Sequence, residues 1–457
     1  MTEGSRLKER SKAYSVFTVL VGALLMGFLW SVRGTHGWGS SWGLLNAGFI
    51  YTVFIICING GRKKLGLGWL SITAISFMLT TPAWGTLLKQ ICGYISFGFN
   101  DTEVVAADVS AFSAIFIMLC MGFGLAALYG ILLGRAYSDV KWKWWHFVVL
   151  IAVFYAVDLI SKAFLSHWIL DIVQPQAKDV FAQGLEMAEK SGSVWKNYME
   201  HFANDSWAKK IYGGRNYFAS VQAIASALRA AAVLIAVRFI IKDKRSANVG
   251  FAVCGSFALA ITVSDLFFFF SEGGWHGEQG FSLPENMAAW GTWEYMTGFI
   301  AGLIITIVML KLKARDDVDD FFVDDVPSTL KELFTFIVGN VVLIGINMVR
   351  PVAERFDDSM NQIVYAVIAA VFALALIIFI SSKCGINASK VDMRYYSALM
   401  LMITVFCVFV MFMFVGTSNY AEIHEVNSFP NIFNVISFVL VMAWSIVNYI
   451  KTKELKN

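Results

Sequence analysis

Residues 31–39 read Ser-Val-Arg-Gly-Thr-His-Gly-Trp-Gly, and residues 271–277 read Ser-Glu-Gly-Gly-Trp-His-Gly. Each phrase ends a long apolar run, and each is followed by tryptophans and then by Gly-Phe-Ile, at residues 48–50 and 298–300. The two copies lie about half of the 457-residue chain apart. Such a recurrence predicts an internal duplication, which is common in secondary transporters whose substrate site lies between the repeats.

The composition is that of a membrane protein. Hydrophobic residues make up 58% of the chain and charged residues only 15%. Apolar runs of about 20 residues recur along the chain, and each is long enough to cross a hydrocarbon core about 30 Å thick. The strands of a membrane β-barrel are shorter and alternate in polarity, so backbone hydrogen bonding in lipid leaves helices. The sequence therefore predicts an all-α, polytopic membrane protein.

Twelve spans are expected. They lie near residues 14–33, 42–58, 66–84, 108–134, 144–166, 217–241, 247–270, 292–312, 331–349, 361–382, 395–416 and 431–450. The basic residues test this number, because Lys and Arg are enriched in cytoplasmic loops. Basic residues precede the first span, and a basic cluster follows every even-numbered span: Arg62, Lys63 and Lys64; Arg135, Lys141 and Lys143; Lys242, Lys244 and Arg245; Lys311, Lys313 and Arg315; Lys383, Lys390 and Arg394; Lys451 and Lys453. This parity predicts that both termini are cytoplasmic.

The duplication and the spans together predict two pseudo-repeated halves of six helices each, at 1–241 and 247–457. The longest outer segment, 167–216, belongs to the first half, and its charges alternate with aromatic residues. That pattern favours one or two amphipathic helices at the outer interface, acting either as a lid or as a passive cap. Residues 86–99 are apolar but too short to cross, so we expect them to be re-entrant or interfacial.

Ionisable residues inside spans are costly and are functional candidates. Arg229 is the sharpest of them, because arginine stays charged and binds carboxylate or phosphate through two parallel hydrogen bonds. We expect it within reach of Asp158, Asp265 or Glu294, or lining a polar cavity. Asp158 and Lys162 are one helical turn apart and could instead neutralise each other. Asp158, Asp265 and Glu294 are also candidates to accept a coupling proton.

The two His-Gly phrases offer further candidates. Glycine beside histidine favours unwinding of a helix, and the exposed backbone then needs a cavity or protein partners. Arg33 and His36 in the first phrase would present cations to an anionic group. Glu272 and His276 in the second form an acid–base pair suited to proton coupling. Two histidines and a carboxylate can also bind zinc, but no established spacing motif supports a metal.

Two tryptophans near these phrases, Trp38 and Trp293, could stack on a sugar or aromatic ring, although both also lie at the depth of an interfacial aromatic belt. The six cysteines are scattered without a CxxC motif, which favours small buried side chains over a metal or disulfide role. We expect no cofactor. We also expect no nucleic-acid partner, because the net charge is only +3 and no dense basic tract occurs.

Twelve spans, cytoplasmic termini and two six-helix halves resemble the major facilitator superfamily in topology. The cytoplasmic motif of that superfamily, G-x-x-x-D-x-x-G-R-K, has a partial counterpart in Gly61-Arg62-Lys63, with Ile58 where the aspartate belongs. The resemblance implies alternating access between the halves and implies nothing about the substrate.

The sequence is best interpreted as a secondary transporter of an inner (cytoplasmic) membrane that carries a small anionic or polyhydroxylated solute. Arg33, Arg229, His36 and His276 would bind the solute. The main alternative is an enzyme, a membrane glycan polymerase, ligase or transferase that meets a lipid-linked substrate at the outer face. A channel is a third, weaker interpretation.

The duplication makes an architectural prediction. Residues 14–241 and 247–450 should superpose as two six-helix halves, with His36 and His276 in equivalent places. A structure that placed the two histidines on opposite sides of the membrane would contradict the duplication.

Overall fold

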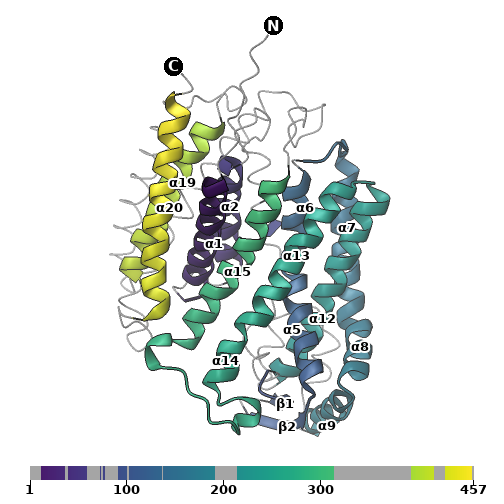
Figure 1. Ribbon diagram of the computed structural model, residues 1–457. Coiled ribbons are helices and arrows are strands. Elements are labelled where there is room, and N and C mark those ends of the chain that lie inside the picture. The colour runs from purple at the N-terminus through teal and green to yellow at the C-terminus, as the bar shows by residue number, and fades with distance from the viewer. Residues whose placement is uncertain are drawn as a thin grey trace, which may run out of the picture. The chain divides into compact units, whose positions relative to one another are not determined.

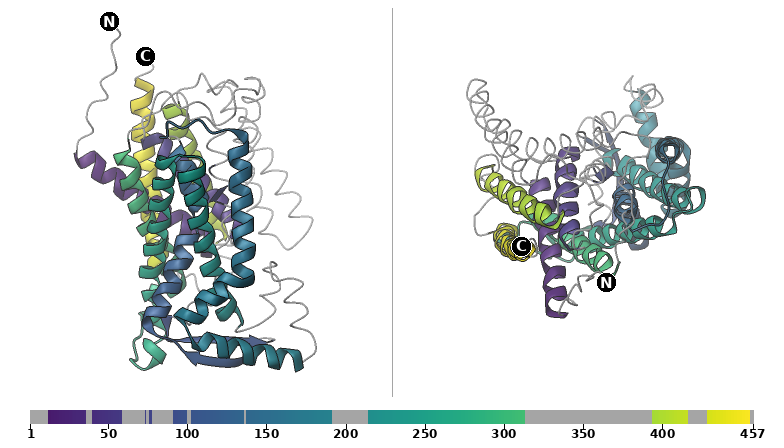
Figure 2. Two further views of the ribbon diagram at one scale, coloured as in Figure 1. Left: turned by 90° about the vertical axis from the view of Figure 1, so that its right-hand side faces the viewer. Right: turned by 90° about the horizontal axis from the view of Figure 1, so that it is seen from above.

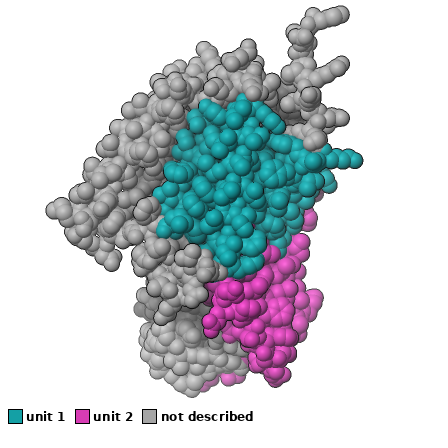
Figure 3. Space-filling model, turned by 60° about the vertical axis from the view of Figure 1, so that its left-hand side comes forward, with its two compact units in different colours: residues 1–75, 298–457 teal, residues 76–297 magenta. Residues whose placement is uncertain are grey.

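The computed structural model describes residues 12–35, 40–58, 73, 76–77, 91–99, 102–135, 137–190, 214–312, 393–415 and 428–454. Nearly all of these residues are helical, and one β-hairpin is present (Figure 1). The chain divides into two compact units, residues 1–75 with 298–457 and residues 76–297 (Figure 3). Each unit is described by itself.

The first unit is built from long apolar helices. Its described elements are α1 (Lys12–Thr35), α2 (Ser40–Ile58), α15 (Ala289–Lys311) from Gly298 onward, α19 (Met393–Val415) and α20 (Phe429–Glu454). Helix α1 packs against α2 and α20, and α19 packs against the same two helices. Gly298 and Gly302 let α15 approach α1 so closely that a Cβ on Gly302 would lie 2.6 Å from the Cβ of Met26.

Polar side chains join these spans. The Tyr51 hydroxyl donates to the carbonyl oxygen of Gly302 at 2.8 Å, and the Nδ2 of Asn434 donates to the Ser31 hydroxyl at 3.0 Å. The Tyr14 hydroxyl donates to Asn448 Oδ1 at 2.7 Å. Hydrogen bonds between helices in lipid each contribute roughly 0.6–2 kcal/mol, so they add to the packing of the apolar surfaces.

The second unit contains a hairpin, a helical bundle and a helix across one end of the bundle. Its elements are β1 (Tyr94–Phe99), β2 (Thr102–Asp108), α5 (Ala111–Gly124), α6 (Ala127–Arg135), α7 (Trp144–Ile160), the π-helical turn η1 (Ser161–Leu165), α8 (Ser166–Val173), α9 (Gln176–Lys190), α12 (Gly214–Ile235), the π-helical turn η2 (Ala236–Ile240), α13 (Lys244–Ser264), α14 (Leu266–Ser271) and the start of α15.

Side-chain caps set where two of these helices begin. Ser110 caps α5 by accepting the backbone N–H of Ser113 at 3.2 Å. The buried carboxylate of Asp243 caps α13, since Oδ1 accepts the Ser246 backbone N–H at 2.9 Å and Oδ2 accepts the Ser246 hydroxyl at 2.7 Å. Oδ2 also accepts the indole N–H of Trp142 at 2.8 Å. Capping satisfies backbone donors that have no partner within the helix.

Glycines bring the bundle helices close together. A Cβ on Gly122 would lie 2.5 Å from the Cα of Ala258 and closer still to the carbonyl oxygen of Phe257, so α5 meets the backbone of α13 there. A Cβ on Gly124 would overlap the Ser226 side chain of α12. Small residues at helix contacts are how membrane helices gain packing without a hydrophobic driving force.

One end of this bundle is covered by short elements. Strands β1 and β2 pair antiparallel from Tyr94 opposite Asp108 to Phe99 opposite Thr102. Helix α9 packs against both strands and against α8, and it runs crosswise to the long helices (Figures 1 and 2). Its sequence is amphipathic, with charged residues alternating with Val, Phe, Leu and Met. The prediction of an amphipathic helix between the fifth and sixth expected spans is therefore confirmed for residues 176–190, and 191–213 lie outside the described residues.

The structure agrees with the prediction of a multi-pass helical membrane protein. Among the described residues, six helices are long and apolar enough to cross a membrane, or seven if α5 and α6 form one span bent by 43°. Two shorter apolar helices, Gly43–Ile58 and Ala398–Val410, match the second and eleventh expected spans. The ninth and tenth expected spans, 331–349 and 361–382, lie outside the described residues, as does all of 66–84 except residues 73, 76 and 77.

Three details differ from the sequence predictions. An all-α fold omits the hairpin, whose strands occupy residues 94–99 and 102–108 and include the last six residues of the segment expected to be re-entrant. The expected span at 108–134 begins at Ala111 and breaks at Leu125 and Ala126. The expected span at 144–166 continues helically to Val173. Apolar content alone does not distinguish a short strand from part of a helix.

The glycine contacts predict a stability difference between two Gly→Ala changes. Gly122→Ala should lower thermal stability in detergent by about 1–3 kcal/mol, because the new methyl group would push against the backbone of α13. Gly255→Ala on α13 is the matched control, since nothing lies within 4 Å of its Cβ position. Equal melting temperatures for the two variants would contradict the close packing.

Candidate functional site

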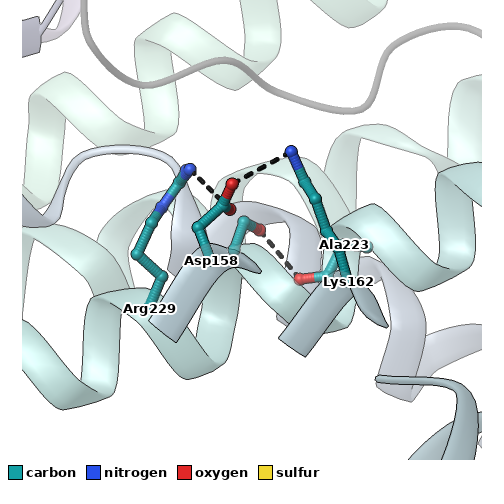
Figure 4. Close-up of polar contacts among 5 residues, drawn as sticks. Asp158, Lys162, Ala223 and Arg229 are labelled. Carbon is teal, nitrogen blue, oxygen red and sulfur yellow. Dashed lines mark hydrogen bonds and ion pairs between the residues drawn. The ribbon is translucent and has the colours of Figure 1, made fainter. Parts of the chain in front are cut away.

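Three charged side chains from neighbouring helices meet inside the second unit. Arg229 of α12 donates from Nη1 to Asp158 Oδ1 of α7 at 2.9 Å, and Lys162 of η1 lies 3.1 Å from Asp158 Oδ2 (Figure 4). The exposed fractions of the side chains are only 6% for Arg229, 13% for Asp158 and 15% for Lys162. We call these three residues the Asp158 network.

The network lies on an irregular stretch of backbone. Lys162 belongs to the π-helical turn that follows α7 without a break. One-turn π-bulges of this kind are frequently found at functional sites. The guanidinium of Arg229 also lies over the ring of Phe154, one turn before Asp158, at 4.2 Å from its centroid. An aromatic face stabilises a desolvated cation by about 2 kcal/mol.

The local sequence explains why Arg229 can be buried here. One turn earlier, Ser226 donates its hydroxyl to the carbonyl oxygen of Ala223, so it needs no partner from another helix (Figure 4). Gly124 packs directly on Ser226, which brings α5 against α12. The sequence prediction that Arg229 has a carboxylate partner is confirmed with Asp158, on the facing helix α7.

A second polar contact lies at the junction between α13 and α14. Asp265 occupies this junction, with an exposed fraction of 1%, and its Oδ1 accepts the indole N–H of Trp293 from α15 at 2.6 Å. Ile91, Cys92, Phe268 and Trp293 form an apolar cluster beside it. The pKa of the Cys92 thiol is raised to about 11, mainly by burial and then by the nearby carboxylates of Glu272 and Asp265.

The second His-Gly phrase is unwound, as the glycines predicted. All three of its glycines, Gly273, Gly274 and Gly277, have positive φ, as does Gly280 just after it, and His276 itself adopts φ 55°. The backbone N–H of His276 donates to the carbonyl oxygen of Cys92 at 2.8 Å, so the phrase is attached to the turn before the hairpin. The His276 Nε2 lies 3.9 Å from Asp108 Oδ1 at the end of β2. Sequence reasoning did not single out Asp108, because a strand ending there was not expected.

The remaining predicted residues are distributed as follows. Arg33 is buried in the last turn of α1, with its guanidinium 4.3 Å from the centroid of the Trp30 ring. Glu294 is buried on α15, whereas Glu272 is exposed at the end of α14. His36 and Trp38 lie outside the described residues. Of the predicted residues of the second unit, Arg229 and Asp158 meet in the Asp158 network, Trp293 contacts Asp265, and His276 lies near Asp108 at the hairpin.

Metal chemistry has no support in the described part of the chain. No group of three or more His, Cys, Asp or Glu side chains that could hold a metal ion occurs among the residues that the structure describes. The five cysteines of the described ranges, at positions 57, 92, 120, 254 and 407, are each buried or half-buried.

Comparison of the chain with protein-family models, with curated proteins and with solved structures gives no match. The function must therefore be argued from the sites themselves.

The Asp158 network predicts energetic coupling between α7 and α12. Asp158→Leu should destabilise the protein by about 3–5 kcal/mol, because it takes the carboxylate away from the buried charge of Arg229. Arg229→Leu should destabilise it by less, because Asp158 keeps its contact with Lys162. The double variant should be less destabilised than the sum of the two, with a coupling energy of about 0.5–3 kcal/mol. Thermal or denaturant unfolding in detergent measures all three. Additive effects would show that the ion pair contributes nothing.

Arg238→Leu provides the matched control. Arg238 lies in η2, at the end of the helix that carries Arg229, and its hydrogen bond to Asn248 is exposed to solvent. Its loss should change stability by less than about 1 kcal/mol, as is usual for exposed polar pairs.

Proposed function

We propose that this protein is a secondary transporter for a small anionic or polyhydroxylated solute. The observation that carries the proposal is the Asp158 network, in which Arg229, Asp158 and Lys162 meet inside a bundle of membrane-spanning helices. Charges at that depth cost several kcal/mol unless they are paired, and in membrane proteins they mark substrate and ion pathways. A purely structural bundle gains more from apolar packing at the same positions.

The chemistry of the three groups fits an anion. Two cationic side chains from different helices converge on one carboxylate, and the planar guanidinium of Arg229 suits a carboxylate or phosphate of the solute. In the proposed cycle the anion competes with Asp158 for Arg229, and Asp158 keeps its contact with Lys162. A solute that separates Arg229 from Asp158 changes the contact between α12 and α7, which links binding to helix movement.

The proposal includes the larger architecture expected from the sequence. It comprises twelve spans, cytoplasmic termini and alternating access between halves at 1–241 and 247–457, in an inner membrane and in the manner of the major facilitator superfamily. Arg33, His36, His276, Trp38 and Trp293 remain proposed binding residues. Glu272, Glu294 and Asp265 remain proposed coupling residues, together with Asp158.

Solute uptake into reconstituted vesicles tests the proposal. Anionic and polyhydroxylated solutes are screened with an imposed pH or ion gradient, and uptake by the intact protein is required. Arg229→Ala should abolish uptake, and Arg229→Lys should restore little, because an ammonium group lacks the planar fork. Arg238→Ala, which removes an exposed arginine beyond the end of α12, should transport normally. Full uptake by Arg229→Ala would remove Arg229 from the site.

One observation favours a second candidate, an enzyme acting on a lipid-linked glycan. His276 is exposed and lies near the carboxylate of Asp108, an arrangement that can orient a histidine as a general base. In a proton-coupled carrier, His276→Gln should flatten the pH dependence of uptake and leave solute binding intact. In a transferase, the same change should remove turnover at every pH. Covalent conversion of a lipid-linked glycan, without gradient-driven uptake of any solute, would establish the enzyme.

A further inference from the structure

The carboxyl group of Asp265 has an unusual environment for a charged side chain. It lies at the junction of α13 and α14 with an exposed fraction of 1%. Its Oδ1 accepts one hydrogen bond, from the Trp293 indole at 2.6 Å, whereas its Oδ2 is buried and has no hydrogen-bond partner among the described residues. The hydroxyl of the preceding residue, Ser264, is buried and likewise has no partner in the described part of the chain.

No cation of the described ranges balances this carboxyl group. Among the residues that the structure describes, Lys162 and Arg229 pair with Asp158, and none forms an ion pair with Asp265. Its neighbours are the apolar side chains of Phe268 and Trp293 and the thiol of Cys92. An ionised carboxylate in such surroundings loses its hydration and gains only one neutral donor in return, which costs several kcal/mol.

Three titratable groups lie near the Asp265 junction. The turn before the hairpin contributes the Cys92 thiol, the end of α14 contributes Glu272, and His276 packs on the same turn through its backbone N–H, which donates to the Cys92 carbonyl oxygen. A metal ion is not supported, because no set of three or more His, Cys, Asp or Glu side chains that could hold one occurs among the described residues. A proton needs only one oxygen atom, and Oδ2 supplies it.

A path to water begins at the same place. Glu272 follows Asp265 by seven residues, and the two residues flank the short helix α14. Both carboxylates act on the pKa of the Cys92 thiol, so both lie near it. Glu272 is exposed to solvent, whereas Asp265 is buried. Glu272 is therefore the exposed carboxylate through which we expect a proton to reach Asp265 from the aqueous phase.

We propose that Asp265 is a proton-binding site, with the proton on Oδ2 and the Trp293 N–H bound to Oδ1. On protonation one O–H bond forms at Oδ2 and the carboxyl group becomes neutral; on release the proton returns to the aqueous phase. The use of this proton to drive solute uptake rests on the proposed function, whereas the site itself does not.

Infrared difference spectroscopy of the intact protein tests the site without a solute. Stepping the pH of wild-type protein should reveal the carbonyl stretching band of a protonated carboxylic acid that titrates. Asp265→Asn, a near-isosteric change, should remove this band. Trp293→Phe should move it to higher frequency, because the carbonyl oxygen loses its hydrogen bond. Glu285→Gln, which changes an exposed carboxyl group of the segment between α14 and α15, should leave it unchanged.

A titrating band that survives in Asp265→Asn, or no such band in the wild type, overturns the proton site. If the band is lost in Asp265→Asn but keeps its frequency in Trp293→Phe, the protonated carboxyl group does not accept a hydrogen bond from Trp293, and that part of the proposal is wrong. Circular dichroism and gel filtration of each variant confirm that the spectra come from folded protein.

Vesicle transport distinguishes failure of this inference from failure of the proposed function. Asp265→Asn should lose proton-driven accumulation of solute while retaining exchange of solute across the membrane at equal pH. Uptake that persists in Asp265→Asn with its pH dependence intact overturns proton coupling through Asp265 and leaves the carrier standing. An Asp265 band that titrates in a protein without uptake supports the proton site and contradicts the carrier.

Discussion

A charged group inside a bundle of apolar helices must find a partner within the bundle, because the membrane offers none. This requirement determines how α7 and α12 lie in the second unit. Arg229 is nearly buried, and it is compensated by Asp158 at 2.9 Å and by the face of Phe154. Burial of the guanidinium therefore depends on two side chains of one neighbouring helix. Close packing of Gly124 on Ser226, one turn before Arg229, brings α5 against the same helix.

The Asp158 network and the junction at Asp265 accommodate buried ionisable groups in different ways. In the Asp158 network two cations share one carboxylate, so in the proposed carrier these groups can stay ionised and exchange partners with a solute anion. At the junction of α13 and α14, Asp265 has a neutral indole donor and no cation among the described residues. A group that is stable only when neutral is suited to carry a proton, and a network of paired charges is suited to bind an ion. A coupled transporter requires both.

At the covered end of the second unit, the second His-Gly phrase packs against the hairpin. The His-Gly phrase at 271–277 is held to the turn before the hairpin through the His276 backbone, and α9 packs across both strands. Gly93, with φ 109°, lies so close to Trp275 and His276 that a side chain there would overlap them. The phrase thus serves as a docking element for the hairpin, and its histidine faces solvent near Asp108. This arrangement keeps the enzyme interpretation open for the same residue that the carrier would use in coupling.

The sequence by itself determined the helical membrane class, the positions of most described helices and the unwinding of the second His-Gly phrase. These are local properties, since the transfer of apolar side chains to lipid and the need to satisfy the backbone act on each segment separately. It also identified Arg229 as a residue that needs a carboxylate, but it left Asp158, Asp265 and Glu294 as equal candidates. Only the tertiary structure decided among them, paired Trp293 with Asp265 and formed the hairpin. Each of those choices depends on which distant residues come within hydrogen-bonding distance when the helices pack. Arg229 and Asp158 are 71 positions apart in the chain, and Trp293 and Asp265 are 28 positions apart.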